Sequence, residues 1–264
     1  MIRMASHKDR KMSLLEYVKV GGIKTARVSR QGLVRTIATE IETHENQSPP
    51  KLLFDVNGHG LALAIMDRAY LEDMNKADII HADGQPLVIA SRLLTRSPIP
   101  ERSATTDLFH DVARSAPTDG VRFFLLGATE EVNKACADKM QQMYPSLDIA
   151  GRRHGYFGRD DEAAVCDEIN RSGANVIWVG LGKPLEQAFC VRNRDRLNAA
   201  WLITCGGCFN YVTGAYARAP DWMQKAGLEW LHRLLTEPKK LGWRYLTTTP
   251  LALILLFART SSKV

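Results

Sequence analysis

The residue best placed by the sequence to act as a base is Asp83. A short apolar run at residues 78–82 is followed by Asp83 and Gly84, and an apolar-periodic segment begins behind Pro86. The pattern predicts a buried strand, a tight turn and a helix, because a helix tolerates proline in its first turn. Asp83 would then lie at the carboxyl end of a strand, where open α/β sheets bind ligands, and could accept a proton from a substrate hydroxyl. The alternative, which this segment taken alone favours, is that Asp83 caps the helix or shapes the turn.

A second polar stretch, residues 55–60, overlaps the end of the apolar run at residues 52–56 and adds two catalytic candidates, Asp55 and Asn57. Two glycines beside them suit a loop that approaches a ligand closely, although a plain strand-to-helix connection explains them equally well. The spacing Asp55-x-Asn57 could suggest a metal ligand pair. The chain contains no D-x-D pair, so we expect no metal site.

Glycine turns follow three further apolar runs. These turns bring to the same edge Gly127, Gly180 with Gly182, and Gly206 with Gly207. The turn at Gly180 is the most informative, because glycines let a chain pass close to a phosphate, a helix N-terminus follows, and Lys183 adds positive charge. Neither G-x-G-x-x-G nor G-x-x-x-x-G-K-[ST] is present, which disfavours a nicotinamide-dependent oxidoreductase.

Two other loops have more than one reading. Cys205 and Cys208 have the spacing of a redox pair or half a zinc site, but a close-approach glycine turn is the better interpretation. His154 and Tyr156 could stack on a nucleotide base, although surface aromatic residues commonly have no such role.

Strand-like and helix-like segments alternate strictly through most of the chain. Expected strands are residues 52–56, 78–82, 121–127, 175–182 and 199–205; expected helices are residues 31–45, 61–76, 106–116, 130–143, 161–172 and 184–198. This alternation predicts an α/β fold with a mainly parallel, Rossmann-like sheet and helices on both faces. Residues 14–30 read as short β segments. We expect a tail at residues 1–13, an α/β domain at 14–213 and a basic amphipathic appendage at 214–264.

The charge of the chain is concentrated at its end. The 264 residues carry a net charge of +6, and residues 214–264 hold eight basic residues against three acidic ones, with three of the five tryptophans. Basic residues mixed with tryptophan and leucine indicate an anionic membrane surface or a phosphate-bearing lipid, and no nucleic acid. The apolar run at residues 250–258 is too short to cross a bilayer but could lie in one. Met223, Ala226, Trp230 and Leu234 recur at helical spacing and predict one apolar helix stripe, with Lys225, Glu229 and His232 turned away from it.

The cysteine content and the N-terminus indicate the compartment. The chain has five cysteines, an odd number, and begins with a polar, basic stretch that lacks the apolar core of a secretory signal. We therefore expect a cytoplasmic protein without structural disulfides.

These segments together resemble the WecG/TagA/CpsF family of bacterial glycosyltransferases (glycosyltransferase family 26). The matching segments are residues 82–84, 100–102, 106–108, 154–157, 180–184, 206–214, 218–220 and 227–238. The most specific of them are residues 206–214, residues 218–220 and residues 227–238, the last of which reads G-L-E-W-L-H-R-L-L-T-E-P.

The resemblance implies metal-independent, inverting transfer of a hexose from a UDP-sugar to a polyprenyl-diphosphate-linked sugar at the inner face of the cell membrane. Asp83 would be the general base. The resemblance places the nucleotide against Arg102, Tyr156 and the 180–187 loop, which includes Glu186 and Gln187. It places the lipid diphosphate against Arg218, Arg233, Lys239, Lys240 and Arg244. No cofactor is implied, and other polysaccharide-assembly enzymes are possible partners.

The chain departs from the family pattern at three places. Asp55-Val56-Asn57 stands where Thr-Pro-Asn is common, Glu186-Gln187 inverts a Gln-Glu pair, and Asn210 replaces an aspartate. All three would lie near the donor pocket. Members of the family transfer N-acetylmannosamine, and one resembles the β-1,4-glucosyltransferase of xanthan biosynthesis; the departures favour a plain hexose donor such as glucose. The rival from another class is a non-catalytic UDP-sugar sensor that docks at membranes.

Overall fold

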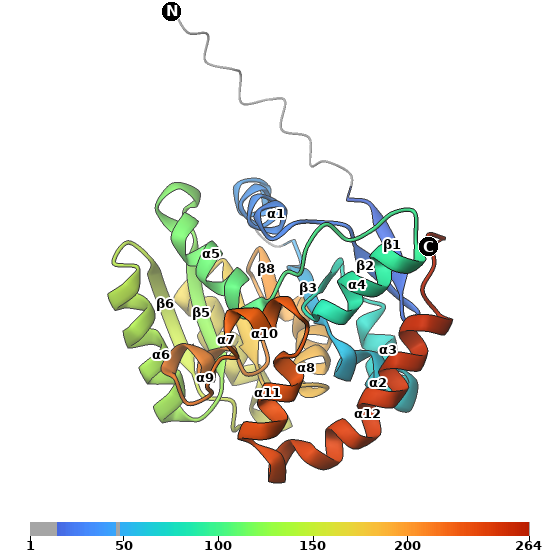
Figure 1. Ribbon diagram of the computed structural model, residues 1–264. Coiled ribbons are helices and arrows are strands. Elements are labelled where there is room, and N and C mark those ends of the chain that lie inside the picture. Colours follow the sequence, from blue (N-terminus) through green and yellow to red (C-terminus); the bar gives the residue numbers. More distant parts are fainter. Residues whose placement is uncertain (1–14, 46–47, 264) are drawn as a thin grey trace, which may run out of the picture.

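Six parallel strands form the central sheet (Figure 1). The computed structural model describes residues 15–45 and 48–263, so the expected tail at residues 1–13 lies outside the described part. In spatial order the strands are β4 (Ile79–Ala82), β3 (Lys51–Val56), β8 (Trp201–Thr204), β7 (Val176–Gly180), β5 (Arg122–Gly127) and β6 (Asp148–Arg153). Every pairing in this sheet is parallel, so all six carboxyl ends lie at one edge.

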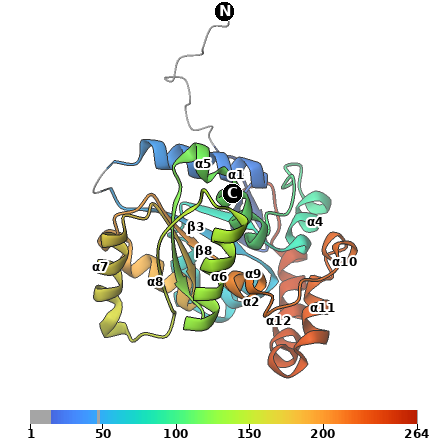
Figure 2. The same cartoon turned by 90° about the vertical axis from the view of Figure 1, so that its left-hand side faces the viewer.

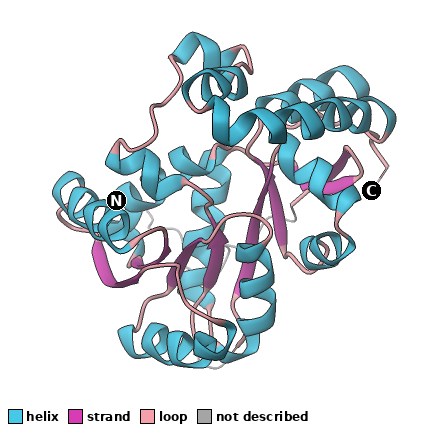
Figure 3. Cartoon of the chain, turned by 90° about the horizontal axis from the view of Figure 1, so that it is seen from below, coloured by secondary structure: helices cyan, strands magenta, loops and turns pink. Residues whose placement is uncertain are grey.

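Helices cover both faces of the sheet (Figures 2 and 3), which confirms the predicted fold class. In chain order they are α1 (Arg30–Thr43), α2 (Gly58–Met66), α3 (Arg68–Met74), α4 (Gln85–Leu94), α5 (Thr105–Asp119), α6 (Glu130–Met143), α7 (Glu162–Ser172), α8 (Leu185–Asn193), α9 (Cys208–Thr213), α10 (Asp221–Lys225), α11 (Glu229–Thr236) and α12 (Pro238–Ala258). Helices α1, α5, α6 and α9 share one core with the sheet, while α2, α3, α4, α7, α8 and α12 share the other. Successive strand residues serve opposite faces: Leu52 and Phe54 belong to the second core and Leu53 to the first.

The strand β6 was not predicted. It is an edge strand and its residues are half-buried or exposed, so it lacks the continuous apolar run that marks the inner strands. Gly151 lets it approach β5, because a Cβ at that position would lie 2.6 Å from the Phe124 ring.

Two expected helices differ from the prediction. The helix expected at 61–76 is two helices, α2 and α3, separated at Asp67, whose side chain accepts a hydrogen bond from Tyr70 N and caps α3. The helix expected at 184–198 ends at Asn193 and continues as a short 3₁₀ turn, Arg194–Arg196.

The C-terminal helices lie together beside the sheet (Figures 1 and 2). The single apolar stripe predicted over residues 223–234 is wrong, because Gly227 has φ +73° and separates α10 from α11. Helix α12 packs against α2, with Ala252, Leu255 and Leu256 buried. No helix within residues 15–45 and 48–263 is long and apolar enough to cross a membrane.

The segment after α12 pairs with a hairpin near the N-terminal end of the described chain. An antiparallel hairpin, β1 (Tyr17–Val20) and β2 (Ile23–Ala26), lies beside the C-terminus (Figure 1). Lys19 N donates to Ser261 O at 3.1 Å and Ser261 N to Lys19 O at 2.9 Å. The segment predicted as an appendage is thus tied to the hairpin as well as to α2.

Candidate functional site

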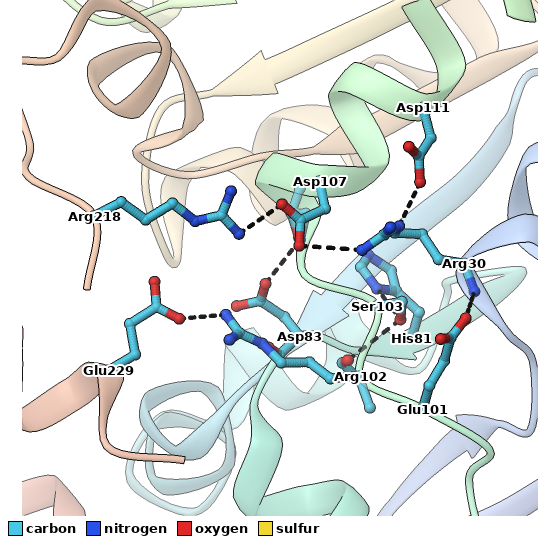
Figure 4. Close-up of polar contacts among 12 residues, drawn as sticks. Arg30, His81, Asp83, Glu101, Arg102, Ser103, Asp107, Asp111, Arg218 and Glu229 are labelled. Atoms are coloured by element: carbon cyan, nitrogen blue, oxygen red, sulfur yellow. Dashed lines mark hydrogen bonds and ion pairs between the residues drawn. The ribbon is translucent and has the colours of Figure 1, made fainter. Parts of the chain in front are cut away.

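Asp83 follows β4 directly and is half-buried at the carboxyl edge of the sheet (Figure 4). Its Oδ1 accepts a hydrogen bond from Thr105 N at 2.9 Å, and its Oδ2 accepts one from Asn57 Nδ2 at 3.1 Å. Thr105 begins α5, so Asp83 does cap a helix, but a different one from the helix that follows it. The N-cap of α4 is Gly84, which has no side chain to bond. Each carboxylate oxygen can accept a further hydrogen bond, so the capping contact leaves Asp83 able to receive a proton.

The surroundings of Asp83 keep its side chain ionised. Burial by itself raises the pKa of a carboxyl group. The charge of Arg102 and the N–H of Thr105 outweigh burial and hold the pKa of Asp83 below its ordinary value, with smaller contributions from Lys183 and Asn57. At neutral pH, Asp83 is therefore a carboxylate, the form in which it can act as a base.

Asn57 orients Asp83 and is itself fixed. Its Oδ1 accepts a hydrogen bond from Gly60 N at 3.1 Å, which caps α2, and this leaves Nδ2 directed at Asp83. The polar turn after β3 and the turn after β4 thus form one unit, since the two strands are neighbours in the sheet.

Arg102 connects Asp83 to the C-terminal helices (Figure 4). Its Nε donates to Asp83 O at 2.6 Å, and its Nη2 lies 2.5 Å from Glu229 Oε2 at the start of α11. Both side chains of this ion pair are less than one-fifth exposed. Glu229 was predicted to face away from the apolar stripe; the structure directs it inward to an arginine.

Two arginines of the C-terminal segment, Arg218 and Arg233, contact residues of the α/β domain. Arg218 Nη2 lies 2.5 Å from Oδ1 of Asp107, in the first turn of α5, and Arg30 Nη1 lies 3.1 Å from Oδ2 of the same residue. The Arg233 guanidinium lies over the rings of Tyr211 and Tyr216, at 5.7 and 5.6 Å from their centroids. Lys239, Lys240 and Arg244 belong to α12, but their side chains lie outside the described part.

Three predicted site residues form a buried charge cluster. Lys183 Nζ lies 2.6 Å from Asp55 Oδ2 and 3.5 Å from Glu186 Oε1. Glu186 and Gln187 are fully buried, and Asp55 is 3% exposed. In this structure the polar groups of Lys183, Asp55 and Glu186 point inward to one another. Direct contact of these side chains with a nucleotide therefore stays a prediction.

The glycines at the carboxyl edge allow the ends of neighbouring strands and the turn after β8 to approach one another closely. A Cβ at Gly127 would lie 2.3 Å from Gly180 O, and a Cβ at Gly180 would lie 3.0 Å from Gly206 O. Gly127 also has φ +140°. At Gly127 and Gly180 the structure shows a close approach between the ends of two paired strands, and the approach to a ligand stays a prediction.

The remaining candidates lie around this edge. Tyr156 is 73% exposed in the loop after β6, and its N–H donates to His154 Nδ1 at 3.2 Å. Gly207 precedes α9, and Asn210 lies within it, half-buried, with its backbone oxygen accepting from Tyr216 N at 3.1 Å.

Cys205 and Cys208, the pair with redox or zinc spacing, lie directly after β8 and at the start of α9. Cys205 and Cys208 are free and buried, and burial raises the pKa of both thiols, so neither is predisposed to be a thiolate. Within residues 15–45 and 48–263, no group of three or more His, Cys, Asp or Glu residues is arranged to hold a metal ion. A surface hollow lined by Ser48, Pro49 and residues 195–198 lies at the opposite, amino-terminal edge of the sheet, away from Asp83.

Comparison with known proteins covers nearly the whole described chain. The sequence profile of the glycosyl transferase WecG/TagA/CpsF family matches residues 18–263. The N-acetylglucosaminyldiphosphoundecaprenol N-acetyl-beta-D-mannosaminyltransferase of Bacillus subtilis (strain 168) is 33% identical over 187 residues, 71% of each chain. The protein of the same name from Staphylococcus aureus (strain MRSA252) is 32% identical over 198 residues, 75% of this chain and 77% of that protein. The family match includes helices α10 to α12 as well as the sheet.

Proposed function

Because the chain belongs to the WecG/TagA/CpsF family of glycosyltransferases, we propose that it transfers a hexose from a UDP-sugar to a sugar carried on a polyprenyl diphosphate. Its relatives are named as N-acetylmannosaminyltransferases that act on N-acetylglucosaminyldiphosphoundecaprenol. The donor hexose here is of the glucose or N-acetylmannosamine type. The product is an intermediate of a cell-envelope glycan or exopolysaccharide.

The observation that carries this proposal is the setting of Asp83. It is an ionised carboxylate at the carboxyl edge of a parallel sheet, held by Asn57 and Thr105, with Arg102 directly beside it. A fixed, charged base next to a cation suits a reaction in which a hydroxyl loses a proton while negative charge develops on a leaving group.

In the proposed reaction, a hydroxyl oxygen of the acceptor sugar attacks the anomeric carbon of the donor. Asp83 takes the hydroxyl proton as the new C–O bond forms. The bond from the anomeric carbon to UDP breaks and UDP departs with the electron pair, its charge balanced by Arg102 and by backbone N–H groups. Displacement from the opposite side inverts the anomeric centre. We propose that no metal ion is required.

We place the acceptor at the C-terminal helices. Arg218 and Arg233 would face its diphosphate, and the exposed apolar side chains of α12 would contact the cytoplasmic face of the membrane. Exposed Trp243, Ile254 and Phe257, together with the basic residues of α12, support this assignment.

The decisive experiment is incubation with a panel of UDP-sugars and a short-chain lipid-diphosphate sugar acceptor, with mass spectrometry of the products. We expect one hexose to be added from one donor, with and without EDTA. Loss of transfer in EDTA, restored by a divalent cation, would contradict the metal-independent reaction. Tight UDP binding without any glycosylated product would replace the proposal with a non-catalytic sensor.

A further inference from the structure

A cluster of three buried charges lies beneath the loops at the carboxyl edge. The side chains of Lys183, Asp55 and Glu186 are 8%, 4% and 0% exposed. Buried charges are costly unless each is paired and hydrogen-bonded. Here Lys183 contacts both carboxylates, and Asp55 Oδ1 accepts a further bond from Thr204 Oγ1 at 3.1 Å. Because these three buried side chains compensate one another and lie at the edge of the sheet where ligands bind, we looked for a role beyond packing.

Glu186 joins two loops through one oxygen atom. Its Oε2 accepts a hydrogen bond from Gly182 N, in the loop between β7 and α8, and another from Gly206 N, between β8 and α9, each at 3.0 Å. These two bonds are strongest when Glu186 is ionised, because hydrogen bonds to an ionised acceptor are stronger than those between neutral groups. The two loops follow neighbouring strands, and this oxygen holds their backbones at a set separation.

Lys183 and Asp55 extend the connection to the candidate base. Asp55 lies on β3 two residues before Asn57, and Asn57 donates to Asp83. The ion pair between Lys183 and Asp55 therefore fixes the β7–α8 loop against the strand that leads into the Asn57–Asp83 unit.

We propose that Glu186, Lys183 and Asp55 form a positioning clamp that keeps the β7–α8 and β8–α9 loops at a fixed distance from each other and from Asp83, without touching the substrate. The inference rests on the proposed function, since it assumes that these loops hold the UDP-sugar. The hydrogen bonds that Asp83 accepts from Asn57 and Thr105 do not involve Glu186, so we expect them to persist when Glu186 is replaced. Opening the clamp should thus raise KM for the donor more than it lowers kcat.

The test compares Glu186→Ala with Glu186→Gln in the full-length protein. Glutamine retains an oxygen that can accept both N–H bonds, whereas alanine leaves Gly182 N and Gly206 N without their acceptor. Hydrogen exchange of the peptides over residues 180–187 and 203–210 is expected to accelerate about tenfold in the alanine variant and to change little with glutamine. KM for the UDP-sugar should rise about tenfold or more in the alanine variant, with a smaller change in kcat. If the alanine variant does not fold, Glu186→Asp, one methylene too short to bridge both loops, takes its place.

Glu162→Ala provides a matched control. Glu162 is also a buried glutamate that accepts several bonds, from Asn193 Nδ2 at 2.8 Å and from Arg192, but these partners lie at the other end of α8. The Glu162→Ala substitution should lower the free energy of unfolding without changing the donor KM or the hydrogen exchange of the two loops.

Three results would contradict the clamp. The first is unchanged hydrogen exchange of the two loops in Glu186→Ala. The others are a rise in donor KM in Glu186→Gln as large as that in Glu186→Ala, or a rise in donor KM in the control Glu162→Ala. The exchange measurement needs no substrate. If no UDP-sugar is transferred by the wild-type protein, the proposed function fails while loop exchange still decides the clamp.

Discussion

Arg102 Nη2 lies 2.5 Å from Glu229 Oε2, while Nε of the same arginine donates to Asp83 O at 2.6 Å. One guanidinium thus links the turn that carries the candidate base to the first residue of α11. A diphosphate that binds Arg102 would have to compete with the Glu229 carboxylate. This arrangement couples occupation of the site to the position of the C-terminal helices.

Substitution of the two partners should have unequal effects. Arg102→Gln is expected to lower kcat/KM for the UDP-sugar by about 10²- to 10³-fold, because it removes a charge directed at the leaving group. Glu229→Gln should lower it by less, because it removes no positive charge from the leaving group, although it leaves the largely buried Arg102 without its charged partner. Steady-state kinetics of both variants measure the difference. An equal loss in Glu229→Gln would mean that the pair must stay intact during turnover.

Asp83→Asn isolates the proton transfer. The asparagine oxygen can still accept the Thr105 N–H, but it cannot take a proton, so kcat should fall by about 10²- to 10⁴-fold while UDP affinity by calorimetry stays nearly unchanged. Asp67→Asn is the matched control, because Asp67 caps α3 through the same kind of bond, to Tyr70 N. Normal turnover in Asp83→Asn would exclude Asp83 as the base.

The buried Glu186 predicts a pH dependence of stability. Burial raises its pKa to about 7, against the opposing charge of Lys183 and with the support of Asp55; Gly182 N and Gly206 N favour the ionised form. A carboxyl group whose pKa is raised by folding binds protons more tightly in the folded state, so its stabilising contribution is present below about pH 4.5 and is lost as pH rises to about 7. The full loss is about 3 kcal/mol.

Glu186→Gln removes this titration. Urea unfolding between pH 5 and pH 8 should show that the variant gains stability relative to wild type as pH rises. A constant difference between the two proteins over this range would contradict the raised pKa.

The exposed face of α12 predicts where the protein contacts lipid. Ile254 and Phe257 are 63% and 69% exposed, although Leu255 and Leu256 between them are buried. Glutamates at these two exposed positions should weaken co-sedimentation with anionic vesicles by about tenfold or more, since each side chain contributes on the order of 1 kcal/mol on burial. Met143→Glu, at an exposed position of α6, is the control. Unchanged binding in the double variant would exclude this face.

Two of the departures from the family pattern prove to be physically connected. Asp55 and Glu186 both contact the ammonium group of Lys183, which lies 128 residues from Asp55 in sequence. The sequence placed all three near a donor site. Their mutual pairing, and with it their burial, depends on β3, β8 and β7 being neighbours.

Local sequence patterns determined most of the elements of this protein. Five of the six strands, the four inner ones and the edge strand β4, are buried along most of their length and are visible as apolar runs, and the turn after residue 82 placed Asp83 at a strand end. The sequence patterns did not predict the edge strand β6 or the break between α2 and α3 at Asp67, because neither is marked by a continuous hydrophobic signal.

The tertiary structure alone decided which side chains contact one another at the candidate site. Asn57 and Thr105 reach Asp83 across 26 and 22 residues, and Arg102 reaches Glu229 across a still longer stretch of chain. Periodicity reports which side of an element is buried, but it contains no information on the order of strands or the docking of helices. Those follow from packing of the whole chain, which turned residues predicted as ligands, such as Lys183, inward and brought Glu229, predicted to face outward, to the site.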